Sequence, residues 1–82
     1  MKKLRMVEVE WVDSFVNGGW RMCKEYLEAP GVSQCRTAGY LLRSNRSEVL
    51  VVQSLNDHGG AADSMTIPRC AVKKIRYLEV KE

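Results

Sequence analysis

Aromatic and polar residues that could bind a ligand gather in one short stretch, between residues 11 and 20. Both tryptophans, Trp11 and Trp20, and the only phenylalanine, Phe15, lie in this stretch, and Trp20 follows two glycines. Arg21 comes directly after Trp20. An indole ring beside a guanidinium can stack on a base and contact its phosphate, and such stacking contributes about 1–3 kcal/mol per base. The stretch is therefore the first candidate binding site.

Two further groups of polar residues complete the candidate site. Asp13 and Ser14 either line a pocket beneath the second tryptophan or cap the turn or helix that follows. Ser64 and Thr66 are two residues apart, which places both hydroxyls on one face of a strand. With Arg69 just beyond, they form either an edge that contacts an anion or ordinary exposed polar surface. The predicted binding residues are Asp13, Ser14, Trp20, Arg21, Ser64, Thr66 and Arg69.

Several of these residues also have a purely structural interpretation. Trp20 could pack the segment that carries it onto the rest of the protein instead of contacting a ligand. Trp11 continues the alternation of a strand, so it is expected in the core. Arg36, Arg43 and Arg46 are expected on the solvated face of a hairpin, and they are also the best candidates for a basic patch.

The sequence does not predict an enzyme. His58 follows Asp57 in a glycine-rich loop and could polarise a nucleophile, but no serine or cysteine motif accompanies the pair. Glu8 and Glu10 share one strand face at the spacing of paired carboxylates, and a cross-strand partnership with Arg or Lys explains them equally. Three cysteines and one histidine complete no common zinc pattern. We therefore expect no catalytic residues, no metal and no cofactor.

Length and composition indicate one small domain, residues 1–82, of ordinary globular composition. A chain of 82 residues buries only about 60–65% of its unfolded surface on folding, so an oligomer interface would add stability. The net charge of +3 favours anionic partners only mildly. No apolar run approaches the roughly 20 residues of a membrane span or forms a signal core. We expect a cytoplasmic protein.

Alternating apolar and polar residues predict a first strand at residues 6–12, with Val7, Val9 and Trp11 on one face. Further strands are expected at residues 34–43, 48–55, 64–67 and 73–80, with one tight turn at 69–72. A short helix or an irregular loop is expected at residues 20–27. Gly39 inside the second strand predicts a bulge or a tight bend. The third strand is apolar on both faces, so one face is expected under a helix or another subunit.

These elements describe a mainly β fold, a small five-stranded, partly open barrel with a short helix or loop insertion after strand 1. The segment from Met65 to Ile75 resembles the closing strand, short turn and last strand of SH3-like and Sm-like barrels. The resemblance therefore implies a fold of that kind.

More specifically, the chain resembles small proteins encoded by tailed phages and prophages. The resemblance is carried by motifs that span most of the chain. They are Trp11-Val12-Asp13-Ser14 with Gly19-Trp20, Gly39-Tyr40-Leu41, and Thr66-Ile67-Pro68 with Lys73-Lys74-Ile75. The resemblance transfers no catalytic residues.

Tailed phages, as a class, encode small oligomeric proteins, called sponges, that sequester nucleotide immune signals of the host. The resemblance implies a non-enzymatic binding protein of this kind in the cytoplasm of a bacterial host. Trp20 would stack a base, Arg21 and Arg69 would hold phosphates, and Asp13 or Ser14 would read ribose or base edges. We expect a small anionic nucleotide ligand, self-association and no membrane partner. The alternative is an Sm-like or SH3-like adaptor that binds RNA or a protein partner.

Overall fold

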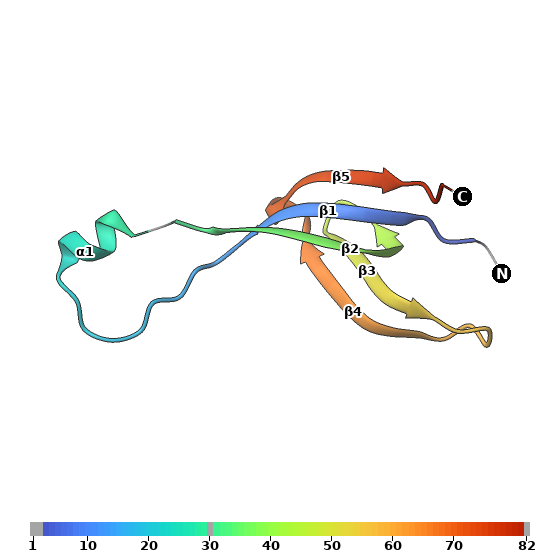
Figure 1. Cartoon of the computed structure of the whole chain (residues 1–82), viewed down its shortest axis with the longest axis horizontal. Helices are drawn as coiled ribbons and strands as arrows, with labels where there is room; N and C mark the ends of the chain where they lie inside the picture. Colours follow the sequence, from blue (N-terminus) through green and yellow to red (C-terminus); the bar gives the residue numbers. More distant parts are fainter. Residues whose placement is uncertain (1–2, 30, 82) are drawn as a thin grey trace.

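The computed structural model describes residues 3–29 and 31–81 and contains one antiparallel sheet (Figure 1). The strands are β1 (Met6–Asp13), β2 (Ser33–Ser44), β3 (Glu48–Leu55), β4 (Ala61–Pro68) and β5 (Val72–Leu78), and the helices are α1 (Cys23–Glu28) and the 3-10 turn η1 (Arg69–Ala71). The strand order is β4-β3-β2-β1-β5. The mainly β class is therefore confirmed, whereas β4 and β5 are the two edges of a sheet that is not closed.

The predicted strands are all present, and the largest difference lies at the start of β4. The sequence predicted a loop through Ala62, but Ala61 and Ala62 already pair with β3, opposite Leu55 and Ser54. Two alanines carry little intrinsic strand preference, so their conformation comes from the ladder with β3. The turn between β3 and β4 is closed instead by Asn56, whose side-chain oxygen accepts hydrogen bonds from backbone amides of the loop.

The second strand changes partner in its middle, at the position where the sequence predicted a bend. β2 pairs with β1 up to Tyr40 and with β3 from Tyr40 onward. At Gly39 the two backbones approach so closely that a Cβ atom would lie 2.7 Å from the carbonyl oxygen of Val52. The side chain of Gln53 bridges the same gap and donates to the Ala38 carbonyl at 2.8 Å. Gly39 is therefore required by this close approach.

The bend brings strands that are not neighbours in the sheet into contact. The indole Nε1 of Trp11 on β1 donates to the Thr37 hydroxyl on β2 at 2.9 Å. The Thr37 hydroxyl in turn contacts the Met65 sulfur on β4 at 3.6 Å. Because β3 separates β2 from β4 in the sheet order, this contact requires the sheet to fold over on itself.

The core lies inside this fold of the sheet and is small. It consists of Val7 and Val9 from β1, Val49 and Val51 from β3, and Ile67 from β4. The partly buried residues packed against it are Trp11, Leu41, Ala71, Val72 and Ile75. The predicted inward face of β1 is therefore confirmed, and every fully buried side chain belongs to the sheet.

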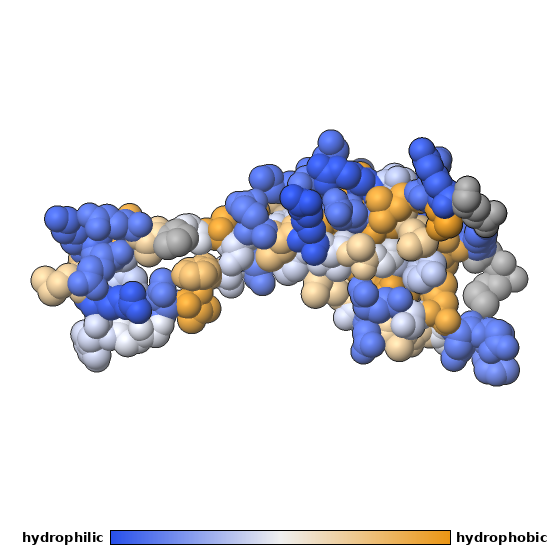
Figure 2. Space-filling model, viewed as in Figure 1, coloured by the Kyte–Doolittle hydropathy of each residue, from blue (hydrophilic) through white to orange (hydrophobic). Residues whose placement is uncertain are grey.

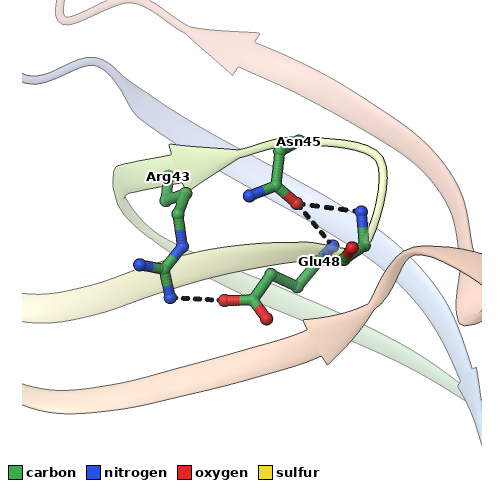
Figure 3. Close-up of polar contacts among 4 residues, drawn as sticks. Arg43, Asn45 and Glu48 are labelled. Carbon is green, nitrogen blue, oxygen red and sulfur yellow. Dashed lines mark hydrogen bonds and ion pairs between the residues drawn. The ribbon is translucent and has the colours of Figure 1, made fainter.

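The turn between β2 and β3 shows how local polar residues set the register of this hairpin (Figure 3). The side-chain oxygen of Asn45 accepts hydrogen bonds from the backbone amides of Ser47 and Glu48, at 2.9 and 3.0 Å. Arg43 forms an ion pair with Glu48 across the hairpin. Asn is favoured in turns because its side chain can bond the backbone in this way.

The segment between β1 and β2, residues 14–32, extends away from the sheet, and we call it the arm (Figure 1). Its helix α1 starts at Cys23, three residues later than predicted, and its N-cap, Met22, has no side-chain cap bond. Trp20 has a relative exposure of 103%, so the expectation that it packs the insertion onto the sheet is wrong. A helix of six residues makes too few contacts with its own chain to select a position on the sheet.

The close approach at Gly39 predicts the effect of a single methyl group. Gly39→Ala should lower the stability by about 1–3 kcal/mol, because the new Cβ must push the β2 backbone away from Val52. Thermal unfolding measures the loss. Gly18→Ala is the matched control, since a Cβ there meets nothing within 4 Å. Equal melting temperatures for the two variants would show that the close approach at Gly39 does not matter.

Candidate functional site

The arm is a loop closed by one hydrogen bond. The chain turns at Gly19, whose φ of +88° is easily adopted only by glycine. Helix α1 then runs back toward the sheet, and the Tyr26 hydroxyl donates to the Gly19 carbonyl at 2.7 Å. This bond joins the two sides of the arm and leaves a space between them.

That space is an open hollow of about 570 Å³, within the size range of small-molecule sites. Its aromatic lining comes from Phe15 on the outgoing side and Tyr26 on the returning side. Ser14 and Asn17 supply polar groups beside these rings. The full lining is Ser14, Phe15, Asn17, Tyr26, Ala29, Gly31 and Val32. The arm therefore offers a planar ligand two aromatic faces and several hydrogen-bonding groups.

A second hollow, of about 170 Å³, lies where the arm joins the sheet, and two cations line it. Lys73 lies at an irregularity of β5, where the pairing with β1 shifts between Glu10 and Trp11. Its amino group donates to the side-chain oxygen of Gln34 at 3.3 Å. Arg36 lies on β2 directly opposite Glu10. The full lining is Glu10, Trp11, Gln34, Cys35, Arg36 and Lys73.

The charge of Glu10 in this hollow is balanced by Arg76 on the neighbouring strand. Arg76 lies 3.1 Å from the carboxylate of Glu10 and 3.2 Å from that of Glu8. The hydrogen bond from Arg76 lowers the pKa of Glu10 below its ordinary value of 4.5, and the charges of Arg36 and Lys73 act in the same direction. The cross-strand interpretation of the two glutamates is therefore confirmed. Among the described residues, neither Arg36 nor Lys73 forms an ion pair within 4.0 Å.

The two hollows lie close together along the same pair of strands. Ser14 of the arm hollow is three residues from Trp11 of the cationic hollow, and Val32 is two residues from Gln34. We call the two hollows together the arm-base site. Its arrangement, aromatic rings next to cations, matches a ligand that combines a planar ring with a negative charge.

Of the predicted binding residues, four lie on the arm or at its base. Asp13 ends β1, and its carboxylate accepts a hydrogen bond from the backbone amide of Ser14 at 2.8 Å. It therefore bonds the start of this turn, whereas helix α1 begins at Cys23 and its N-cap residue, Met22, makes no side-chain cap bond. Ser14 lines the arm hollow. Trp20 and Arg21 are exposed near the turn of the arm.

The other three predicted residues form a separate surface. Ser64 and Thr66 are exposed on the edge strand β4, which two strands separate from β1. Arg69 follows in η1, and its guanidinium donates to the Ser44 hydroxyl at 3.1 Å. This contact ties η1 to the β2–β3 turn. The role of these three residues as an edge that contacts an anion stays a prediction, separate from the arm-base site.

Sequence reasoning missed the residues that give the arm-base site its character. Phe15 and Tyr26 line the same hollow only because the arm folds back at Gly19. Lys73 enters the cationic hollow at an irregularity of β5 that no sequence pattern marked. Arg36 was grouped with Arg43 and Arg46 as a candidate basic patch, but Arg43 pairs with Glu48 instead. The sequence does contain one signal of the cationic hollow: Arg36 and Gln34 are two residues apart, so they lie on the same face of β2.

The reactive histidine and cysteine side chains lie at separate places, and one of them, Cys35, lines the cationic hollow. His58 Nε2 lies 3.3 Å from Asp57 Oδ1 in the exposed β3–β4 loop. Cys23 and Cys70 are exposed free thiols, and Cys35 is a partly buried one. Within residues 3–29 and 31–81 there is no group of three or more His, Cys, Asp or Glu that could hold a metal ion. None of the described helices is long and apolar enough to cross a membrane.

Comparison of the chain with models of protein families, with curated proteins and with solved structures finds no match.

The ion pairs of Arg76 predict a pH-dependent contribution of Glu10 to stability. The folded-state pKa of Glu10 is lowered, so its contribution is present above the ordinary value of 4.5 and disappears as the pH falls through the folded pKa. Glu10→Gln should therefore lower the melting temperature at pH 7, and the difference from the parent protein should shrink as the pH falls below 4.5.

The control for this experiment is Glu79→Gln. It removes an exposed carboxylate for which no ion-pair partner is found among the described residues. A difference for Glu10→Gln that stays constant from pH 7 to pH 3 would contradict the assigned role of the ion pair.

Proposed function

We propose that this chain is a non-enzymatic binding protein that captures a small nucleotide-type ligand at the arm-base site. The observation that carries the proposal is the position of the aromatic hollow, with Phe15 and Tyr26, next to the cations Arg36 and Lys73. A nucleotide joins a planar base to an anionic phosphate, and these two groups are complementary to the aromatic rings and the cations of the site.

Each part of the ligand has a partner in this arrangement. The base stacks on aromatic rings of the arm, to which the exposed Trp20 adds a third, and Arg21 lies beside that indole for a phosphate. A second phosphate contacts Arg36 and Lys73. Asp13 and Ser14, between the two hollows, face the ribose or the base edge. Capture without turnover is the role that these contacts support.

The fold agrees with this role. The strand order β4-β3-β2-β1-β5, the 3-10 turn before the last strand and the bend at Gly39 support an SH3-like or Sm-like barrel that is open between β4 and β5. Together with the sequence resemblance to phage proteins, this supports an oligomeric sponge that acts against nucleotide immune signals in the bacterial cytoplasm. The arm hollow is open, so a neighbouring copy could complete its walls.

The direct test is native mass spectrometry of the protein with a panel of nucleotides. The panel contains cyclic dinucleotides, cyclic ADP-ribose isomers and short oligonucleotides. We expect a fixed mass gain from a mono- or dinucleotide, with the ligand released intact on denaturation. Spectra free of ligand with every compound would refute the proposal, and a gain from oligonucleotides alone would favour an RNA-binding adaptor.

Two variants test whether the ligand lies on the arm and at its base. Trp20→Ala should weaken binding about tenfold or more without loss of stability, because Trp20 is exposed and a stacked base contributes about 1–3 kcal/mol. Lys73→Gln should weaken binding of phosphate-containing ligands. Arg46→Gln, the same loss of one charge in the exposed β2–β3 turn, is the control. Equal affinities for the three variants would place the ligand elsewhere.

A further inference from the structure

The chain exposes far more surface than a compact protein of its size. The radius of gyration is 16.8 Å, whereas a compact domain of this length has about 12 Å. The accessible surface is 6815 Å², and a compact monomer of 9.3 kDa is expected to expose about 5,000 Å². The excess of about 1,800 Å² per chain lies within the range that one partner buries in an obligate homo-oligomer, about 1,000–2,500 Å².

The arm carries a large share of the exposed apolar side chains. More than half of the exposed large hydrophobic side chains among residues 3–29 and 31–81 lie on the arm. They are Phe15, Val16, Trp20, Met22, Tyr26, Leu27 and Val32. Figure 2 shows this lobe standing clear of the sheet, with hydrophobic surface on it. Exposed apolar surface of this extent marks an interaction site.

The described residues of the arm contribute no side chain to the hydrophobic core of their own chain. Every fully buried residue lies on β1, β3 or β4, and the cluster around them is likewise made by residues of the sheet and η1. Helix α1 has no buried residue. An isolated helix of six residues is unstable in water, so α1 requires a surface that covers it.

The charge of the arm selects among the surfaces that could cover it. Its ionisable side chains are Arg21 and Lys24, balanced by Glu25 and Glu28, so the net charge of the arm is zero. A segment without net charge gains no net electrostatic attraction to an anionic membrane or a nucleic acid, and it can approach an identical copy without repulsion. Self-complementary contacts between identical chains are the commonest route to oligomers.

We infer that the arm is the surface through which this chain associates with a second copy of itself, burying Val16, Leu27 and helix α1 in the interface. This inference deepens the proposed function, because it names the contact that closes the open arm hollow. It is independent of ligand identity, since the arm is apolar and uncovered whatever the hollow binds.

The test measures the mass of the full chain in solution without ligand, by light scattering over a wide range of concentrations. We expect at least two copies of the 9.3 kDa chain per particle. Leu27→Asp and Val16→Asp should each raise the dissociation constant about tenfold or more, because each places a charge in an apolar contact. Both side chains are 85% exposed, so neither substitution should lower the stability of the sheet.

The matched control is Lys24→Gln, which changes the net charge by the same amount on the same helix at a polar position. It should leave the mass unchanged. Hydrogen exchange adds a measurement that needs no variant: the α1 amides should be protected in the parent protein at high concentration and lose that protection on dilution.

Two results would overturn the inference. One is a particle of 9.3 kDa at every concentration with rapidly exchanging α1 amides. The other is an oligomer whose mass is the same for Leu27→Asp, Val16→Asp and Lys24→Gln, which would place the interface elsewhere. Binding of nucleotides is measured separately, so an oligomer that binds none of them refutes only the proposed function, and a monomer that binds one refutes only this inference.

Discussion

The close approach of β2 and β3 at Gly39 is the constraint on which the rest of the structure depends. A Cβ atom at Gly39 would lie only 2.7 Å from the Val52 carbonyl oxygen. Because glycine lacks this atom, β2 can leave β1 and turn toward β3 within one residue. Without that turn the sheet would be flat, and Val9 on β1 would not meet Ile67 on β4. The small core exists because a residue without a side chain stands at this corner.

The bend also fixes the base of the arm. It brings β4 over the sheet far enough for Met65 to contact Thr37, which holds the indole of Trp11 in place. The irregular pairing of β5 beside Trp11 then directs Lys73 toward Gln34. The cationic hollow is therefore built on the sheet, whereas the aromatic hollow belongs to the arm.

The sequence groups residues that are next to each other in the chain, but it cannot group residues that only folding brings together. Asp13, Ser14, Trp20 and Arg21 form a recognisable run, and all four lie at or on the arm. The sequence suggests grouping Ser64, Thr66 and Arg69 with that run only because their side chains have suitable chemistry. The sheet order places two strands between β4 and β1. Tyr26 and Lys73 were missed because a loop closure and a β-irregularity bring them to the site.

The sequence by itself determined the strands of this protein. Alternation with a period of two, as in Val7, Val9 and Trp11, is a local pattern, and it places the apolar side chains on one face of a sheet. The sequence also determined the corner at Gly39 and the turn at Asn45, since each requires a particular residue type. Tertiary structure alone decided that β4 and β5 remain unpaired edges and that the arm leaves the sheet. Both depend on which surfaces meet, and the apolar side chains of the arm find no partner surface within the described part of their own chain.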